Sequence, residues 1–386
     1  MNSAIFALPH VAAGFVAVLV GYSSSVAIIF QAATAAGATA AELASWMWAL
    51  GIGMGASCIG LSLYFRTPIL TAWSTPGAAL LVTGLGGLNM AQSIGVFLAA
   101  SFLITLAGAS GGFQRLMSIV PRHLASAMLA GILVRFGMDA FVSMQTQPLL
   151  IAVMLAAWLA AQLITPRYTV PIALVAGIAC AALMGLLRLE TLNWAPAMPV
   201  FMAPQFSWQA FIGVAVPLFI VTMTSQNVPG LAVLRANGYS TPASPLIGWT
   251  GFTGLVLGPF GGFSFNLAAI TAAICMSRDA DPDPGRRYMA AVWAGVFYLI
   301  TGIFGATVVS LFTAFPVELV AAIAGLALLG TIASSLSGAL ADEYGRDAAI
   351  VTFLCTASGL SLFGIGSAFW GLVLGLLVHV LKLHKR

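Results

Sequence analysis

The chain has 386 residues, of which 61% are hydrophobic and only 6% are charged. Soluble domains carry about 25% charged residues, because a water-facing surface needs them. This composition excludes a soluble globular protein and predicts an all-α polytopic membrane protein. The net charge of +4 comes from single basic residues scattered between apolar runs, which is typical of a topology signal rather than of a nucleic-acid surface.

Apolar runs predict fourteen transmembrane segments. They cover residues 10–33, 44–64, 69–86, 90–109, 123–141, 149–165, 170–187, 208–234, 243–258, 261–277, 288–312, 317–334, 347–363 and 366–381. If the N-terminus is cytoplasmic, most of the 14 basic residues fall on that side, namely Arg66, Arg115, Arg122, Arg167, Arg235, Arg278, Arg286, Arg287, Arg346, Lys382, Lys385 and Arg386. The positive-inside rule therefore predicts a multi-pass inner (plasma) membrane protein with both termini in the cytoplasm.

The third and tenth segments resemble each other. The third contains TAWSTPGAALL and the tenth GGFSFNLAAIT, and both run from an aromatic residue and Ser, through two variable residues and one small or apolar residue, to Ala-Ala. Seven segments separate the two strings, and an odd number of crossings turns the second copy upside down in the membrane. The pattern predicts a 7+7 inverted repeat.

Both segments are also interrupted. Pro68 and Pro76 break the third, while Pro259, Gly261 and Gly262 precede the tenth. Each segment is therefore expected to be half extended and half helical. Helix N-termini directed at the membrane midplane would offer unpaired N–H groups to an anion. The alternative is a pair of ordinary proline-kinked helices.

The residues near this crossing are polar or aromatic, and none is acidic. The predicted substrate-binding residues are Tyr22, Ser24, Ser25, Ser74, Thr75, Gln226, Asn227, Phe263, Ser264, Phe265 and Asn266. A carboxylate about 4 Å from an anionic substrate would cost on the order of 4 kcal/mol at an effective dielectric constant near 20. Aromatic rings can hold a flat ring between them; each ring taken alone is more typical of packing or of a lipid-facing position, so the inference rests on their clustering. These features together predict a small aromatic carboxylate as the substrate.

Four strings, LPHVAAGFVAVLVGYSSSVAIIFQAA, TAWSTPGAALL, TSQNVPGLAVL and GGFSFNLAAITAAI, resemble the benzoate:proton symporter family along essentially the whole chain. The resemblance implies one transport domain over 1–386, with a core (1–110 and 208–312) and a gate (111–207 and 313–386). It extends more distantly to nucleobase transporters such as the uracil permease, where carboxylates on segments eight and ten bind the base. Gln226 and Asn266 stand at or beside those positions here, which argues against a nucleobase.

The predicted function is proton-coupled uptake of benzoate or a related small aromatic carboxylate. The expected partners are this substrate, a proton and the lipid bilayer, with a homodimer allowed for. The proton carrier stays open between the substrate carboxylate itself, Glu318, Asp139 and His10. Alternatives are an inorganic-anion or nucleobase carrier of the same architecture, and a channel.

An enzyme is not expected, because the four histidines lie at segment ends or in the tail and no HExxH or GxSxG motif is present. No metal, cofactor or disulfide is expected either. The four cysteines, Cys58, Cys180, Cys275 and Cys355, lie inside apolar runs and never form a CxxC pair.

Overall fold

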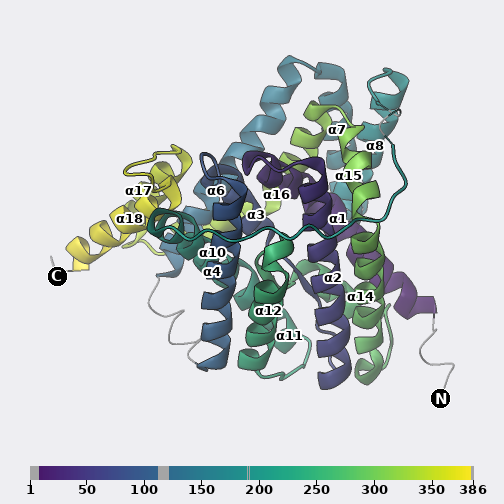
Figure 1. Ribbon diagram of the computed structural model, residues 1–386, viewed down its shortest axis with the longest axis horizontal. Coiled ribbons are helices and arrows are strands. Elements are labelled where there is room, and N and C mark those ends of the chain that lie inside the picture. Colours follow the sequence, from purple (N-terminus) through teal and green to yellow (C-terminus); the bar gives the residue numbers. More distant parts are fainter. Residues whose placement is uncertain (1–7, 112–120, 189, 191, 384–386) are drawn as a thin grey trace.

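The computed structural model describes residues 8–111, 121–188, 190 and 192–383 of a predominantly helical chain (Figure 1). Within the described residues, six helices are long and apolar enough to cross a membrane, and one bent helix pair makes a seventh if it is counted as one span. This confirms a helical, polytopic membrane fold. The topology signals at Arg115, Lys385 and Arg386 lie outside the described residues.

Each predicted apolar run contains helix. The first half comprises α1 (Leu8–Ala35), α2 (Ala40–Phe65), α3 (Thr75–Gly84), α4 (Met90–Ala109), α6 (Arg122–Val142), α7 (Pro148–Ile164) and α8 (Thr169–Leu183). The second half comprises α9 (Trp208–Ala210), α10 (Val216–Thr222), α11 (Val228–Ala236), α12 (Ala243–Leu257), α13 (Ile270–Cys275), α14 (Tyr288–Ile303), α15 (Gly305–Thr313), α16 (Val317–Leu340), α17 (Arg346–Ala357) and α18 (Ser367–Leu383).

Two of the predicted runs depart from a regular straight helix. The run 208–234 forms one continuous helix in which two π-helical stretches, Phe211–Ala215 and Met223–Asn227, join α9, α10 and α11. Single-turn π-bulges of this kind are frequent at functional sites. The run 288–312 is divided into α14 and α15, which meet at an angle of 68°.

Local sequence explains where several helices begin and end. Thr39 starts α2 with a capping box that includes Glu42, so two backbone N–H groups at this end are satisfied. Gly37 and Gly238 follow α1 and α11 with φ of +72° and +85°, a region that favours glycine. These two glycines hold matching places in the two halves of the sequence.

Close packing between helices depends on glycine. A Cβ atom on Gly51 of α2 would lie 2.4 Å from the Cα atom of Gly302 on α14, and one on Gly108 of α4 would lie 2.2 Å from the backbone N of Gly248 on α12. On the other side of the molecule, α6 and α16 approach each other at Gly325, where a Cβ would lie 2.4 Å from the carbonyl oxygen of Phe136. Small residues allow this close approach, which drives helix association in lipid.

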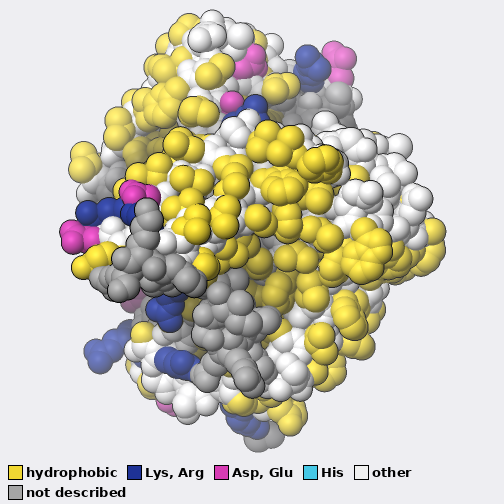
Figure 2. All heavy atoms as spheres, turned by 90° about the vertical axis from the view of Figure 1, so that its left-hand side faces the viewer, with side chains coloured by type: hydrophobic (Ala, Val, Ile, Leu, Met, Phe, Trp, Pro, Cys, Tyr) yellow, Lys and Arg dark blue, Asp and Glu magenta, His cyan; other side chains and the backbone are white. Residues whose placement is uncertain are grey.

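The surface agrees with a membrane location. Figure 2 shows one face on which hydrophobic side chains form a broad patch, with charged side chains toward its margins. The long connection 192–207 runs as extended chain across the molecule (Figure 1). Two of its backbone N–H groups pair with the first two turns of neighbouring helices: that of Val200 donates to Oγ of Ser45 on α2, and that of Gln205 donates to the carbonyl of Ala91 on α4.

Candidate functional site

The third and tenth segments cross as two short antiparallel strands. Strand β1 (Thr71–Trp73) pairs with β2 (Phe265–Leu267), and Ala72 lies opposite Asn266. Helices α3 and α13 continue the two segments beyond the strands. The prediction that each segment is extended and then helical is confirmed, and the antiparallel pairing agrees with an inverted repeat.

Polar side chains from neighbouring helices hold the two strands. Asn227 is fully buried, and its Oδ1 atom accepts a hydrogen bond from the Leu267 backbone N–H at 3.0 Å. Oγ1 of Thr71 lies 2.6 Å from Oγ of Ser57 on α2. The Trp73 indole donates to Oγ of Ser25 on α1 at 2.7 Å. Extended backbone inside a membrane needs such partners, because lipid offers none.

A cavity of about 790 Å³ opens beside this crossing. Its size lies in the range of small-molecule sites, which is about 300–1,000 Å³. Of the predicted binding residues, Ser24, Ser25, Thr75 and Gln226 line it, and Trp73 lines it as well. None of the described lining residues carries a charge, so the cavity is polar through hydroxyl, amide and backbone groups alone.

The remaining predicted polar residues lie behind the cavity wall. Ser74, Ser264 and Asn266 are fully buried at the strand crossing, as is the bracing residue Asn227. Oγ of Ser264 and Oδ1 of Asn266 have no hydrogen-bond partner among the described residues. These four residues therefore shape the crossing, and they do not line the cavity in this structure.

The predicted aromatic residues are also placed away from the cavity. Phe263 packs against Trp46 and Phe97, with ring centroids 5.9 and 5.2 Å away. Phe265 occupies the space that the missing side chain of Gly53 leaves on α2. Tyr22 stands edge-on to Trp73 with a centroid distance of 4.8 Å. Of the four aromatic side chains Tyr22, Trp73, Phe263 and Phe265, Trp73 is thus the one that lines the cavity.

The expectation of bare N–H groups at the start of α3 is largely wrong. Ser74 donates its own N–H to the carbonyl of Ser264 at 3.1 Å, and its Oγ accepts from the Gly77 N–H at 3.0 Å. Pro76 has no N–H, and the Ala78 N–H donates to the carbonyl of Ser74. Among the described residues, Thr75 alone keeps an N–H without a partner in the first turn of α3.

Free donors remain elsewhere in the cavity wall. The backbone N–H groups of Ala269, Ile270 and Thr271 have no hydrogen-bond partner among the described residues, and all three residues line the cavity. In contrast, the hydroxyls of Ser24 and Ser25 both donate to the carbonyl of Gly21. These serines therefore present oxygen lone pairs to the cavity rather than hydrogens.

Several lining residues were not predicted from the sequence. They are Thr169 on α8, Thr271 on α13, Tyr298 on α14, and Ala327, Thr331 and Ser334 on α16. The α16 residues are spaced i, i+4 and i+7, so one face of this helix closes the cavity opposite α1. This helical spacing of small and polar residues could have been recognised in the sequence as a face of α16 that lines a cavity. Nothing local marks Tyr298, whose position depends on how α14 packs against α1.

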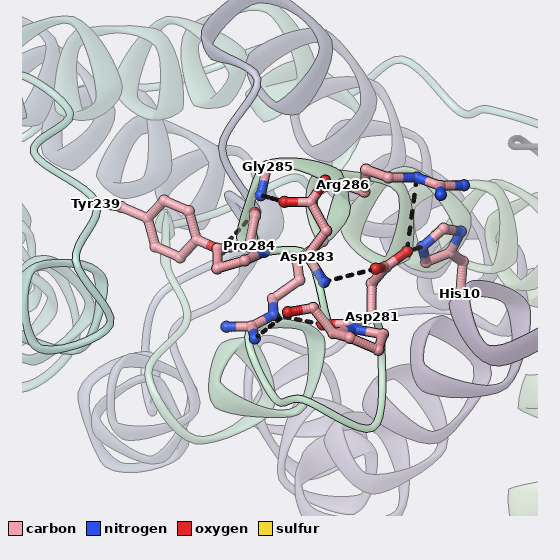
Figure 3. Close-up of polar contacts among 9 residues, drawn as sticks. His10, Tyr239, Asp281, Asp283, Pro284, Gly285 and Arg286 are labelled. Carbon is pink, nitrogen blue, oxygen red and sulfur yellow. Dashed lines mark hydrogen bonds and ion pairs between the residues drawn. The ribbon is translucent and has the colours of Figure 1, made fainter.

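An ionic cluster joins the start of α1 to the loop that follows α13 (Figure 3). Nε2 of His10 and Nε of Arg286 lie 2.8 and 3.7 Å from Oδ2 of Asp281, and the Asp283 N–H donates to Oδ1 at 2.8 Å. Burial by itself raises the pKa of Asp281, but the hydrogen bonds from Asp283 and His10 and the charge of Arg286 together lower it below its ordinary value. The cluster lies outside the cavity lining.

Comparison with known proteins agrees with this geometry. Residues 4–381 match the family described as Benzoate membrane transport protein. The chain is 53% identical over 372 residues to the Inner membrane protein YdcO of Escherichia coli (strain K12), covering 96% of this chain and 95% of that protein. It is 40% identical over 374 residues to the Benzoate membrane transport protein of Acinetobacter baylyi, covering 97% and 95%.

Among solved structures, the transmembrane domain of the cyanobacterial bicarbonate transporter BicA has a similar fold. The TM-score is 0.59 at 14% identity, and the match covers 97% of this chain and 96% of that one. This likeness concerns the fold alone. The family match and the close relatives show that the chain belongs to the benzoate membrane transport protein family and is a membrane transporter, not an enzyme.

Proposed function

We propose that this protein takes up benzoate, or a closely related small aromatic carboxylate, together with a proton. The observation that carries the proposal is the uncharged cavity at the strand crossing, which combines free N–H and amide donors with an aromatic wall at Trp73. A neutral lining binds an anion without the repulsion that a buried carboxylate would add. The relative from Acinetobacter baylyi, a Benzoate membrane transport protein, supports the same substrate.

In the proposed pose, the substrate carboxylate lies toward the free donors of Thr75, Gln226 and the start of α13. The ring then lies against Trp73 and the apolar part of the wall, which includes Val20 and Leu328. Hydrogen bonds to a charged group contribute about 1.5–3 kcal/mol each, whereas aromatic contacts contribute about 0.5–1.5 kcal/mol. Affinity is therefore expected to depend mainly on the carboxylate.

We further propose fourteen crossings, with both termini in the cytoplasm of an inner-membrane protein. The cavity is lined at one end by Ser277, Pro166 and Ser334, which lie near the loops that carry Arg278, Arg167 and Arg346. Under the positive-inside rule these loops are cytoplasmic, so the structure corresponds to an inward-facing state. A homodimer stays a prediction.

The division into a core and a gate is supported by how the helices pack. Helix α2 packs along α14 and α4 along α12, whereas α6 packs along α16 and α17. The cavity lies between the two groups, because α1, α3 and α13 line one side and α8 and α16 the other. Movement of one group against the other would alternate access to the site.

The proton is proposed to travel on the substrate carboxyl group. Of the three other candidates, His10, Asp139 and Glu318, none lines the cavity. His10 is fully buried in the ionic cluster with Asp281. In this order of events the substrate binds as the carboxylate anion, and a proton then taken up on its carboxyl group neutralises it for the crossing, which removes most of the cost of moving a charge through a low-dielectric interior.

Purified protein in liposomes tests the proposal. Labelled benzoate should accumulate when the proton concentration is higher on the side of addition, and accumulation should stop when the pH gradient is dissipated. Unlabelled benzoate should compete, whereas uracil should not. Competition by sulfate or bicarbonate but not by benzoate would instead identify an inorganic-anion carrier. Uptake that does not saturate would indicate a channel.

A further inference from the structure

Tyr298 on α14 reaches the cavity from a helix that the sequence did not connect with the site. Its side chain is 2% exposed, yet it lines the cavity wall. Its hydroxyl group has no hydrogen-bond partner among the described residues, although a phenol O–H is both a donor and an acceptor. The hydroxyl oxygen is not among the fully buried, unpartnered side-chain atoms of the described residues, so it borders the cavity, where a group that enters can accept its hydrogen.

Because Gly21 on α1 has no side chain, there is space beside it for the Tyr298 hydroxyl group. A Cβ atom on Gly21 would lie 3.3 Å from the Tyr298 hydroxyl oxygen and 3.7 Å from Cγ2 of Thr271. All three residues line the cavity. Gly in a helix interior destabilises the helix by roughly 0.5–1 kcal/mol relative to Ala. The missing side chain of Gly21 leaves a notch in the surface of α1, where the helix backbone faces the cavity beside the Tyr298 hydroxyl.

Neighbouring groups fix the position of the Tyr298 ring. The Tyr22 ring lies 6.2 Å from it and stands edge-on to Trp73, which donates to Oγ of Ser25. The carbonyl of Gly21 is already occupied, because it accepts from the hydroxyls of Ser24 and Ser25 at 3.0 and 2.7 Å. The Gly21 carbonyl at the notch therefore already has its hydrogen-bond donors, and the phenol hydrogen of Tyr298 can bond to a group that enters from the cavity.

We propose that Tyr298 donates its phenol hydrogen to the substrate carboxylate and that the notch at Gly21 lets the carboxylate reach it. The inference rests on the proposed function, since it names the carboxylate of an aromatic acid as the acceptor. A hydrogen bond to an ionised acceptor is roughly twice as strong as a neutral one. Tyr298 would then complete the donor set formed by Thr75, Gln226 and the start of α13.

The experiment measures binding and uptake of labelled benzoate by Tyr298→Phe, Gly21→Ala and wild type, with Tyr64→Phe as the matched control. Tyr64 lies at the end of α2 and is 81% exposed. Tyr298→Phe keeps the ring and removes only the hydroxyl, so benzoate should bind about 10- to 100-fold more weakly. The expected pattern is a raised KM with a nearly unchanged Vmax and melting temperature. Gly21→Ala should weaken binding too, since its methyl group occupies the notch.

Each outcome decides between the possibilities. Benzoate binding by Tyr298→Phe at wild-type strength would overturn the role of Tyr298, and so would a loss that only follows a lower melting temperature. If Tyr298→Phe fails to fold, Gly21→Ala decides, because it leaves the phenol in place; wild-type affinity in that variant would overturn the notch. Wild-type protein that binds no benzoate would overturn the proposed function and this inference together. The other outcomes concern only Tyr298 and Gly21 and leave the proposed function standing.

Discussion

Asn227 and Gln226 are adjacent in the π-helical stretch Met223–Asn227, but the structure gives them different environments. Asn227 is fully buried and accepts the Leu267 N–H of β2 at 3.0 Å. Gln226 is half-buried and lines the cavity, and its side-chain amide has no hydrogen-bond partner among the described residues. Alanine at position 227 should therefore lower the stability of the fold, whereas alanine at position 226 should weaken benzoate binding and leave the stability unchanged.

Asn227→Ala leaves the buried Leu267 N–H of β2 without its hydrogen-bond acceptor. An unsatisfied buried donor costs about 1–3 kcal/mol, and the lost contact of Nδ2 with Sδ of Met223 adds to this. A loss of 1 kcal/mol corresponds to about 2–4 °C in melting temperature for a domain of 150–250 residues and to less for this chain of 386 residues. The expected result is a melting temperature lowered by several degrees, with little protein left to transport at growth temperature.

Gln226→Ala removes a cavity-facing amide that no other part of the described chain uses. The melting temperature should therefore stay at the wild-type value. If Gln226 binds the carboxylate, the lost hydrogen bond corresponds to about 1.5–3 kcal/mol, or roughly a 10- to 150-fold rise in KM for benzoate.

Thermal melting of the detergent-purified variants, combined with benzoate uptake in liposomes, separates the two effects. A normal melting temperature with a raised KM in Asn227→Ala would show that Asn227 contacts substrate and that its contact with β2 is dispensable. A destabilised Gln226→Ala with unchanged KM would show that the amide supports the fold. Either result would refute the assignment made from the cavity.

Two further predictions concern packing and pH. Gly51→Ala should lower the melting temperature by an overpacking cost of about 1–3 kcal/mol, because its Cβ would lie 2.4 Å from the Gly302 backbone, whereas Gly60→Ala on the same helix meets nothing within 4 Å and should match wild type. The lowered pKa of Asp281 means that its contacts, including the one with His10, stabilise the fold above its ordinary pKa of 3.8, and this contribution is lost as pH falls through the lowered value. Asp281→Asn should thus melt earlier at neutral pH and lose less stability below about pH 4, and identical acid profiles would contradict this.

The interrupted segments could be predicted because their signals are local. Pro76 fixes its own φ and lacks an N–H, Gly261 permits the positive φ of +94° that the turn before the tenth segment needs, and the matched strings around them identified the two copies. The positions Gly37 and Gly238 follow the same logic, since each closes a helix with positive φ. The side chains that line the cavity were harder to predict, because lining depends on which face of a strand or helix meets which neighbour.

Phe263 and Phe265 illustrate this limit. Their sequence position beside Ser264 and Asn266 suggested an aromatic pair around the substrate. In the structure both side chains fill space next to helices of the core, Phe263 against Trp46 and Phe265 against Gly53. Tyr298, in contrast, has no polar neighbours in sequence and becomes part of the wall only because α14 packs closely on α1.

Ser74 and Ser264 hold equivalent positions in the two copies of the repeat but have different backbone conformations. This difference determines which segment keeps unpaired backbone N–H groups. Ser74 has extended φ and ψ, caps α3 and accepts from the Gly77 N–H, so helix begins directly after it. Ser264 has a φ of +44°, and its carbonyl accepts the Ser74 N–H, so the tenth segment stays extended through β2. Helix α13 therefore begins only at Ile270 and has no side-chain cap. Among the described residues, the N–H groups left unpaired at the crossing therefore lie mainly on the tenth segment, because the third has used nearly all of its own, and it is there that the proposed carboxylate would bind.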